Sequence, residues 1–314
     1  MALTLARHWR IDAADLRYVP AGAGGYHWSV DDRDGRRWFA TADDLDSKGW
    51  LGNDRDTAAA GLATAMDTAA ALRRSGLAFV LAPVPAADGA TVVPATPRYT
   101  VSVFPFVDGT SGRFGEDPPP GQPEQVAVLL AALHQAAPAA TGVRRARVAL
   151  PRRPDLEAAL ADLARPWPGG PFAEPARALL TAAAAPVRAM LQAFDQLADP
   201  VRAAPSLVIT HGEPHHGNVI QTGAGLMLID WDTVGLAPAE RDLWMVTSGG
   251  DAAARRYATA TGQAPDPGLL AFYRMRWALD DISSYVRHLR APHDRTPGTE
   301  DIWRRLAAAL NEAG

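Results

Sequence analysis

Cysteine is absent from the 314 residues of the chain, and lysine occurs only once, at Lys48. The lack of cysteine excludes disulfide bonds and thiolate metal ligands. No run of about 18 apolar residues occurs, and the first residues, MALTLARHWRIDAADL, have no long apolar core. The net charge is only -4, and no basic patch of the kind that binds nucleic acid is present. We therefore expect a soluble cytoplasmic protein that binds neither nucleic acid nor membrane.

A polar loop between two short apolar segments carries most of the reactive side chains. Residues 207–209 have the composition of a buried strand, and residues 226–229 form a second one that stops at Asp230. The loop after the first strand contains His211, Glu213, His215, His216 and Asn218. Polar groups at the ends of buried strands are held by a rigid scaffold, and we expect the functional site here.

These side chains suit phosphoryl transfer. The amide oxygen of Asn218 and the carboxylate of Asp230 are hard oxygen ligands of the kind that bind Mg²⁺. The carboxylate of Glu213 is then left to act as a base. A base that orients a hydroxyl, together with two oxygen ligands that hold the metal on the phosphates, is what phosphoryl transfer requires.

Residues 211–218, with the sequence HGEPHHGN, resemble the H-G-D-x-H-x-x-N loop of the aminoglycoside phosphotransferase family, which shares the protein-kinase fold. Residues 229–232, with the sequence IDWD, resemble the metal motif I-D-W-[DE] of that family. The resemblance implies that Glu213 is the catalytic base. It also implies that Asn218 and Asp230 are the metal ligands.

Neighbouring residues support this loop. Under the resemblance, Asp242 braces the loop from the helix that follows. We place His211 in the catalytic set beside Glu213. Both His211 and His215 are expected to hydrogen-bond the loop and the turn near Asp230.

Glu213 departs from the family, which usually has aspartate at this position. The longer side chain moves the carboxylate by roughly one methylene, and a misplacement of about 1 Å can cost 10²-fold in rate. Pro214 restricts the backbone of Glu213 to an extended region. We predict a working base with the substrate hydroxyl held slightly further back. The alternative is a weak or inactive enzyme.

The histidines also permit a different interpretation, a transition-metal site. The four side chains with a plausible ligand spacing are His211, Glu213, His215 and His216. A metal-dependent hydrolase or a metal-binding protein would follow from that site. Because it leaves Asn218 and the IDWD segment without a role, we favour the kinase interpretation.

The N-terminal part has the pattern of antiparallel strands, with a glycine-rich turn between the first two. The expected strands are residues 16–20, 26–30 and 37–41. Glycines in such a turn let backbone amides approach phosphates closely. Gly22 and Gly24 match the start of a kinase-type G-x-G-x-x-G, and we assign them, with Gly25, to the phosphates of a nucleotide.

The third strand lacks the lysine that neutralises the phosphates of the donor in kinases. Thr41 stands near that place, and Lys48 lies a few residues further on. We predict that Lys48 reaches back to the phosphates from the connection between strand and helix; an exposed loop lysine is the alternative. The next element is expected to be a helix at residues 55–74, capped by Asn53 or Asp54.

Two further strands, at residues 79–85 and 98–103, precede Phe104 and Phe106. The resemblance places here the hinge that holds the purine, with both rings against the base and core packing as the alternative. A Gly- and Pro-rich stretch follows, where we set the boundary between two lobes. The lobes are residues 1–108, which bind the nucleotide, and residues 109–314, which carry the catalytic loop and bind the substrate.

The C-terminal part has helical periodicity. The expected helices are residues 124–136, 156–164, 176–197, 252–260, 269–290 and 299–311. His134, on the first of these, is expected to be a buried structural histidine. In antibiotic kinases of this type, C-terminal helices wall the acceptor pocket, and acidic groups there suit cationic antibiotics. We therefore assign Trp277 and one of the neighbours Asp280 and Asp281 to the substrate.

We thus predict an α+β protein with a two-lobed, protein-kinase-like fold: a small N-terminal lobe with an antiparallel sheet and a large, mainly helical C-terminal lobe. Its function would be transfer of the γ-phosphate of ATP or GTP, with Mg²⁺, to a hydroxyl of a small molecule. An antibiotic is the favoured acceptor, which implies resistance or self-protection. The alternatives are a metabolite kinase acting on choline, homoserine or a sugar, and a non-catalytic nucleotide-binding pseudokinase. We expect a monomer or a homodimer.

Overall fold

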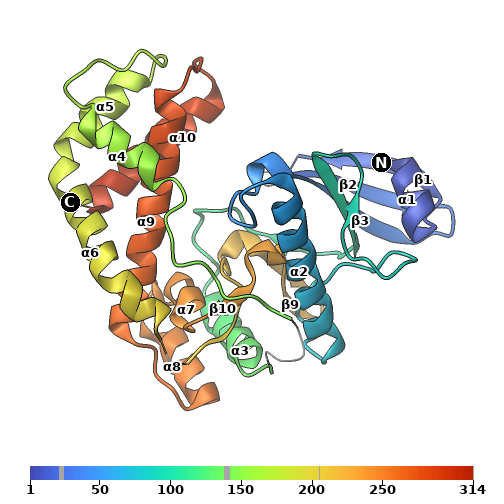
Figure 1. The fold of residues 1–314 in the computed structure, drawn as a ribbon. Helices are drawn as coiled ribbons and strands as arrows, with labels where there is room; N and C mark the ends of the chain where they lie inside the picture. Colours follow the sequence, from blue (N-terminus) through green and yellow to red (C-terminus); the bar gives the residue numbers. More distant parts are fainter. Residues whose placement is uncertain (21–24, 138–141, 205, 314) are drawn as a thin grey trace. The chain divides into compact units, whose positions relative to one another are not determined.

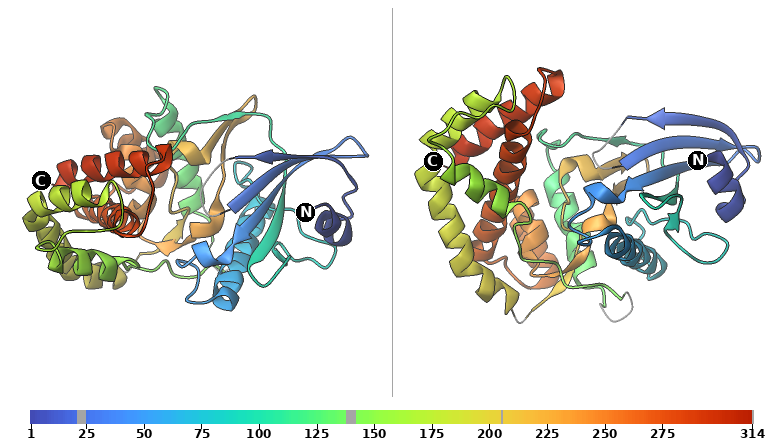
Figure 2. Two further views of the ribbon diagram at one scale, coloured as in Figure 1. Left: turned by 90° about the horizontal axis from the view of Figure 1, so that it is seen from above. Right: turned by 45° about the horizontal axis from the view of Figure 1, so that its top comes forward.

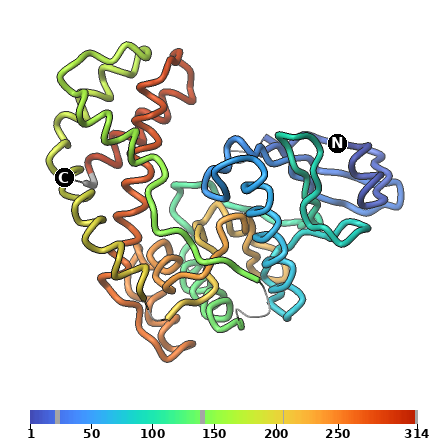
Figure 3. Tube along the Cα trace, in the orientation of Figure 1, coloured from blue at the N-terminus to red at the C-terminus, as the bar shows by residue number. Residues whose placement is uncertain are grey.

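The computed structural model describes residues 1–314 with the exception of 21–24, 138–141, 205 and 314. The chain forms two compact units, Met1–Ala146 with Ser206–Pro265 and Arg147–Pro205 with Asp266–Gly314. Figure 3 allows the chain to be followed by colour through each unit. The predicted lobe boundary after residue 108 lies inside the first unit, and a division at that point stays a prediction.

The first unit begins with a five-stranded antiparallel sheet in the order β1-β2-β3-β5-β4 (Figure 1). Its strands are β1 (Ala13–Val19), β2 (Gly25–Asp32), β3 (Arg37–Asp44), β4 (Val93–Pro94) and β5 (Tyr99–Pro105). The three strands predicted for the N-terminal part are confirmed. Because β3 continues to Asp44, Asp43 belongs to the sheet, where it lies opposite Gly25 and Thr100.

One face of this sheet is apolar and packs against α1 (Ala2–Trp9). The buried residues of this core are Leu5, Ile11, Val30, Ala40, Ala42, Val101 and Val103. Because side chains alternate along a strand, Ala40 and Ala42 enter the core while Thr41 and Asp43 point to the opposite face. The sequence pattern did not predict α1, since its 8 residues span only about two turns, too short a stretch for a periodic pattern to identify a helix.

Helix α2 (Arg55–Arg74) has the predicted bounds. Asp54 caps it by accepting a hydrogen bond from the Thr57 N–H at 2.8 Å, and Oγ1 of Thr57 accepts one from the Asp54 N–H at 3.2 Å. This reciprocal pair satisfies two donors that the first turn of a helix leaves without partners. α2 packs against the turn η4 (Trp231–Thr233).

The strand predicted at residues 79–85 is wrong. The segment is irregular, and within it Val80 forms only an isolated bridge, to Leu228. Pro83 and Pro85 lack the N–H donors that a continuous ladder would need. The apolar residues of this segment therefore do not build a strand.

The remaining elements of the first unit surround the polar loop. They are η1 (Leu45–Ser47), β6 (Thr110–Ser111), α3 (Gln122–His134), β7 (Val208–Thr210), η3 (His216–Asn218), β8 (Val219–Thr222), β9 (Gly225–Leu228), β10 (Gly235–Ala237), α7 (Glu240–Thr247) and α8 (Asp251–Thr261). β7 pairs with β10, and β6, β8 and β9 form a three-stranded sheet. The apolar strands predicted before the loop and before Asp230 are thereby confirmed.

The second unit is helical (Figure 2). Its helices are α4 (Arg153–Ala161), α5 (Ala173–Ala182), α6 (Ala184–Arg202), α9 (Pro267–Arg290) and α10 (Pro297–Ala313). α9 packs against each of the other four. The single helix predicted at residues 176–197 is wrong, because α5 ends and α6 begins on either side of Ala183. Pro186 explains the break, since proline has no N–H for the preceding turn but is tolerated near a helix start.

An antiparallel sheet followed by a mainly helical remainder confirms the predicted α+β class. Within the described ranges, no helix is both long and apolar enough to cross a membrane.

Candidate active site

A single carboxylate organises the polar loop that follows β7. Asp242, in the first turn of α7, accepts hydrogen bonds from the backbone N–H groups of Gly212 at 2.6 Å and His211 at 2.8 Å. Gly212 has a φ of +102°, and a Cβ at this position would lie 2.6 Å from Oγ1 of Thr233. Only glycine fits both constraints. The predicted brace by Asp242 is confirmed.

Asp242 belongs to a buried chain of hydrogen bonds. Nε2 of His134 lies 3.1 Å from Oδ2 of Asp242, and Nδ1 lies 2.9 Å from the hydroxyl of Tyr257. Burial alone would raise the pKa of Asp242, but its hydrogen bond with His134 and the charge of Arg241 outweigh burial and lower that pKa. The carboxylate is therefore ionised and can accept the loop N–H groups. His134 is a buried structural histidine, as predicted.

His211 connects the loop to the end of β9. Its ring is fully buried, with Nε2 2.8 Å from the carbonyl oxygen of Ile229 and Nδ1 3.3 Å from the backbone nitrogen of Glu213. A proton on Nε2 satisfies both bonds, since Nδ1 then accepts the N–H of Glu213. Burial lowers the pKa of His211, so the ring is neutral at pH 7. Its hydrogen bonds confirm the expected link between the loop and the turn near Asp230.

Asn218 ties the loop together. Its side-chain Nδ2 donates to the backbone carbonyl oxygen of Glu213 at 3.0 Å. The backbone carbonyl oxygen of Asn218 accepts the N–H of Ile229 at 3.0 Å. The side chain is buried, and its described hydrogen bonds run through Nδ2. Oδ1 of Asn218 is therefore the atom left to bind a cation.

Asp230 has a left-handed backbone, with φ of 62° and ψ of 68°. This conformation is uncommon outside glycine and is best tolerated by Asp and Asn. The charge of Asp232, followed by burial, raises the pKa of Asp230 well above its ordinary value, and Glu213 adds to the effect. The negative charges of Asp232, Glu213 and Asp43 thus disfavour a charge on Asp230. A divalent cation with oxygen ligands would relieve this repulsion, and the residues present fit such an ion.

The alternative transition-metal site is not formed. Both ring nitrogens of His211 are engaged, one with the carbonyl oxygen of Ile229 and one with the N–H of Glu213. Nε2 of His215 lies 3.4 Å from Nδ2 of Asn218. In the part of the chain that the structure describes, no three histidine or acidic side chains gather as ligands of one ion. Burial also lowers the pKa of His215 to about 4, so this ring carries no charge at pH 7.

Lys48 is buried between two carboxylates. Its Nζ lies 2.9 Å from Oδ1 of Asp43 and 2.7 Å from Oδ2 of Asp232, and the residue is 5% exposed. Burial alone would lower the pKa of Lys48, but the charges of Asp232 and Asp43 outweigh burial and raise that pKa. The alternative of an exposed loop lysine is therefore wrong. The ammonium lies beside the segment that carries Asp230, and its contact with phosphates stays a prediction.

The glycine-rich turn is described only at its end. Gly22 and Gly24 lie outside the described residues. Gly25 begins β2, opposite Asp43 of β3, and a Cβ on Gly25 would lie 3.6 Å from Oδ1 of Asp43. The assignment of these glycines to phosphates stays a prediction.

The two phenylalanines of the predicted hinge have different surroundings. Phe104 lies in β5 opposite Phe39 of β3. The guanidinium carbon of Arg37 lies 4.3 Å from the centroid of the Phe106 ring, and Arg37 also forms an ion pair with Asp108. Both rings are half-buried. Their contact with a purine stays a prediction.

The three predicted substrate residues lie on α9, in the second unit. Asp281 accepts hydrogen bonds from Trp277 and Tyr285, and burial, followed by the charge of Asp280, raises the pKa of Asp281 to about 6. Oδ1 of Asp280 is buried and has no hydrogen-bond partner among the described residues. The neighbours therefore differ: Asp281 is engaged within the helix, while Asp280 keeps an unused acceptor. Their part in substrate binding stays a prediction.

The phosphotransferase enzyme family (APH) matches residues 15–277. The chain belongs to this family. The match includes the N-terminal strands, the polar loop and the IDWD segment, and it confirms the predicted family and reaction class. The protein is a phosphotransferase.

Known proteins resemble this phosphotransferase over almost its full length. Protein StrN of Streptomyces griseus is 29% identical over 315 residues, which cover 95% of this chain and 86% of that protein. A spectinomycin phosphotransferase, solved with ADP and spectinomycin, has a TM-score of 0.76 at 16% identity and covers 99% of this chain and 96% of its own. A microcompartment-associated aminopropanol kinase has a TM-score of 0.65 at 17% identity, and the match covers 99% of this chain and 95% of that kinase. At these identities the two structures show the fold, and they confirm the predicted kinase-like architecture.

Three residues around the site of this phosphotransferase were not found from the sequence. Asp43 and Asp232 hold Lys48, and Tyr257 holds His134. Asp232 did carry a signal, because it is the second acid of the IDWD segment. Tyr257 carried none, because it lies 123 residues from its partner.

Proposed function

We propose that this phosphotransferase transfers the γ-phosphoryl group of ATP or GTP to a hydroxyl of a small molecule, with Mg²⁺ as cofactor. The hydrogen-bonded frame around Glu213, Asn218 and Ile229 carries the proposal. It holds a candidate base and one oxygen ligand on the loop, next to the strand end that supplies the second ligand, Asp230. Phosphoryl transfer depends almost entirely on such positioning and on charge stabilisation.

Glu213 is the base in this proposal. It orients the acceptor hydroxyl and takes its proton as the acceptor oxygen bonds to the γ-phosphorus. The bond between that phosphorus and the β,γ-bridging oxygen breaks, and ADP or GDP leaves. His211 accepts the N–H of Glu213, so it keeps the backbone of the base from rotating.

Asn218, through Oδ1, and Asp230, through its carboxylate, hold the Mg²⁺ ion. The ion supplies positive charge to the phosphates during transfer. The raised pKa of Asp230 supports a cation here, because the neighbouring carboxylates of Asp232 and Glu213 leave negative charge to be neutralised.

The nucleotide is bound by the N-terminal sheet and the turn that follows β3. The glycines at 22, 24 and 25 and the ammonium of Lys48 contact the phosphates, and Phe104 and Phe106 contact the base. The similar spectinomycin phosphotransferase was solved with ADP, which supports a nucleoside triphosphate as donor.

We infer that the acceptor is an antibiotic, phosphorylated in the cytoplasm for resistance or self-protection. The similarity to a spectinomycin phosphotransferase favours this class. Asp280, on α9, has a carboxylate oxygen without a partner among the described residues, which suits a cationic group of the antibiotic. Trp277 and Asp281 lie on the same helix. The similarity to an aminopropanol kinase favours a second candidate, a small amino alcohol.

Incubation of the purified protein with antibiotics and amino alcohols tests the proposal. ATP and GTP would be supplied in parallel, each with Mg²⁺ and with a chelator, and products would be weighed by mass spectrometry. We expect one compound to gain a single phosphate only when Mg²⁺ is present, and Asp230→Asn to abolish the product. Phosphorylation that persists with chelator, or in Asp230→Asn, would contradict the assigned metal site. A protein that binds neither nucleotide would contradict the proposal as a whole.

A further inference from the structure

Lys48 lies on a turn rather than on the third strand, so its position depends on what holds that turn. η1 follows β3 directly, and Lys48 ends it with its N–H bonded to the carbonyl oxygen of Leu45 at 3.3 Å. A lysine side chain is a flexible stem with a compact charge. Keeping its ammonium between Asp43 and Asp232 therefore requires a backbone that does not move.

The start of the turn is fastened to the sheet. Oδ1 of Asp44 accepts the N–H of Asp46 at 3.2 Å, and the carbonyl oxygen of Asp44 accepts the hydroxyl of Ser47 at 2.7 Å. The guanidinium of Arg98, next to β5, donates to both carboxylate oxygens of Asp44 at 2.9 and 2.6 Å. In addition, the N–H of Leu45 donates to the carbonyl oxygen of Arg98 at 3.0 Å.

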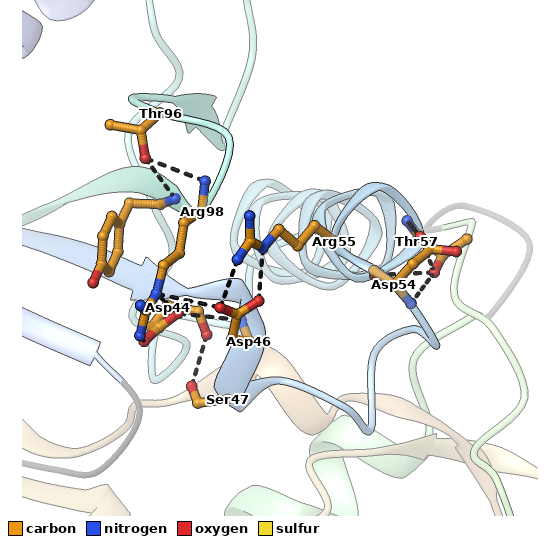
Figure 4. A network of polar contacts seen from close by, with 9 residues as sticks. Asp44, Asp46, Ser47, Asp54, Arg55, Thr57, Thr96 and Arg98 are labelled. Carbon is orange, nitrogen blue, oxygen red and sulfur yellow. Dashed lines mark hydrogen bonds and ion pairs between the residues drawn. The ribbon is translucent and has the colours of Figure 1, made fainter.

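Asp46 joins the turn to helix α2. The guanidinium of Arg55, the first residue of α2, donates to Oδ1 and Oδ2 of Asp46 at 2.6 and 2.7 Å. Nε of Arg98 lies 3.4 Å from Oδ2 of the same carboxylate. Figure 4 shows the two arginines approaching the turn from opposite sides. Because a bidentate pair fixes direction as well as distance, Asp46 sets the turn relative to α2. Its single contact with Arg98 adds to the bidentate pair that the same guanidinium forms with Asp44.

Global stability does not account for this arrangement. The side chains of Arg55 and Asp46 are 46% and 42% exposed. Ion pairs at such exposure contribute little to folding, because water screens them. Their effect is local, and Lys48 lies only two residues beyond Asp46, at the end of the same turn.

We propose that Asp46 is a positioning residue for Lys48. Held by Arg55 and Arg98, it fixes the turn and thereby keeps the ammonium seated between Asp43 and Asp232. This seating does not depend on what the enzyme phosphorylates. Only its consequence for phosphate binding rests on the proposed function.

The chain offers a direct test because Lys48 is its only lysine. The intact protein would be treated with a small amine-acylating reagent, and mass spectrometry would follow the modification of Lys48 and of the α-amino group. The wild-type ammonium, buried and paired, is expected to react slowly. We expect Asp46→Asn to react severalfold faster at Lys48, with the α-amino group as internal reference. Asp46→Glu keeps a carboxylate and is expected to react close to the wild-type rate.

Asp195→Asn is the matched control. Asp195 also binds an arginine through both oxygens, Arg153, in the second unit, and the two side chains are 54% and 30% exposed. We expect this variant to leave the reactivity of Lys48 unchanged and to shift Tm about as little as Asp46→Asn does. A wild-type rate in Asp46→Asn would overturn the proposal, and so would equal acceleration in Asp195→Asn.

Nucleotide kinetics separate the positioning role from the proposed function. If both hold, Asp46→Asn raises the KM for the nucleotide more than it lowers kcat, and Asp46→Glu restores most of the KM. Faster acylation with an unchanged KM would still support the positioning of Lys48, and would instead contradict its contact with the phosphates.

Discussion

Nε2 of His134 lies 3.1 Å from Oδ2 of Asp242, and the two side chains are 1% and 0% exposed. The same carboxylate accepts the N–H groups of His211 and Gly212. A residue of α3 thereby helps to fix a loop that begins more than 70 positions further along the chain. The geometry of the candidate base depends on this buried carboxylate.

Replacing Asp242 should therefore be costly. Asp242→Ala leaves Nε2 of His134 without its partner and two loop N–H groups without an acceptor. Loss of one member of a buried charged network costs roughly 3–5 kcal/mol. Tyr257→Phe removes one hydrogen bond from the same chain and should cost only about 1 kcal/mol. Urea denaturation of both variants measures the free energies of unfolding. Equal losses of unfolding free energy in the two variants would show that Asp242 contributes no more to this hydrogen-bond network than Tyr257 does.

Asp230→Asn should stabilise the protein when no divalent cation is present. Its neighbours disfavour the ionised carboxylate of Asp230 in the folded state, and asparagine tolerates the left-handed backbone almost as well. Thermal unfolding in chelator should thus give a higher Tm for the variant than for the wild type. Adding Mg²⁺ should raise the Tm of the wild type only. A lower Tm for Asp230→Asn in chelator would show that the neighbouring carboxylates do not destabilise an ionised Asp230.

Lys48→Met should lower both stability and nucleotide affinity. The variant leaves Asp43 and Asp232 buried without a counter-charge, which costs roughly 3–5 kcal/mol, and it removes the ammonium assigned to the phosphates. A second change, Asp43→Asn, made in the Lys48→Met background, removes one unpaired charge. It should restore part of the stability without restoring the KM for the nucleotide. An unchanged KM in Lys48→Met would remove Lys48 from the nucleotide site.

The pH dependence of stability should report Asp281. Its pKa is raised from 3.8 to about 6, so between these values the folded protein holds a proton that the unfolded chain releases. The associated stability is fully present below about pH 4 and is lost progressively as the pH rises from about 4 to about 6, a change of about 3 kcal/mol. Asp281→Asn should remove this decline in urea denaturation series.

Asp195→Asn again provides the contrast. Arg153 lowers the pKa of Asp195, so that carboxylate stabilises the fold at neutral pH and ceases to do so in acid. Because this pair is exposed and screened by water, its replacement should change the pH dependence of stability only slightly and leave the decline between pH 4 and 6 in place. If Asp281→Asn kept the wild-type decline between pH 4 and 7, Asp281 would not be its source.

The local parts of the fold and site could be predicted from sequence. Apolar runs that end in polar residues predicted the strands before His211 and Asp230, and Asp54 predicted the start of α2. These sequence signals lie within a few residues of the strand or helix that they predict. The helix break at Ala183 was missed because an alanine-rich stretch has strong helix propensity throughout, so only Pro186 marked the boundary.

Long-range partnerships could not be predicted. Lys48 and Asp232 are 184 residues apart, and His134 and Asp242 are 108 apart. Nothing in the local pattern pairs them, because burial and charge compensation arise only when the elements pack. The difference between Asp280 and Asp281 was also missed, because two adjacent acids look alike in the sequence and only the structure shows that Oδ1 of Asp280 is buried without a partner.

If Glu213 is the base, removing its negative charge should slow phosphate transfer itself, and a kinetic comparison of three proteins can show this. The rate of phosphate transfer to an accepted compound would be measured for the wild type, for Glu213→Gln and for Glu157→Gln, an exposed control on α4. We predict that Glu213→Gln lowers kcat by about 10²–10⁴-fold with little change in the KM for the nucleotide, and that Glu157→Gln matches the wild type. A Glu213→Gln variant that kept the wild-type kcat would show that Glu213 is not the base.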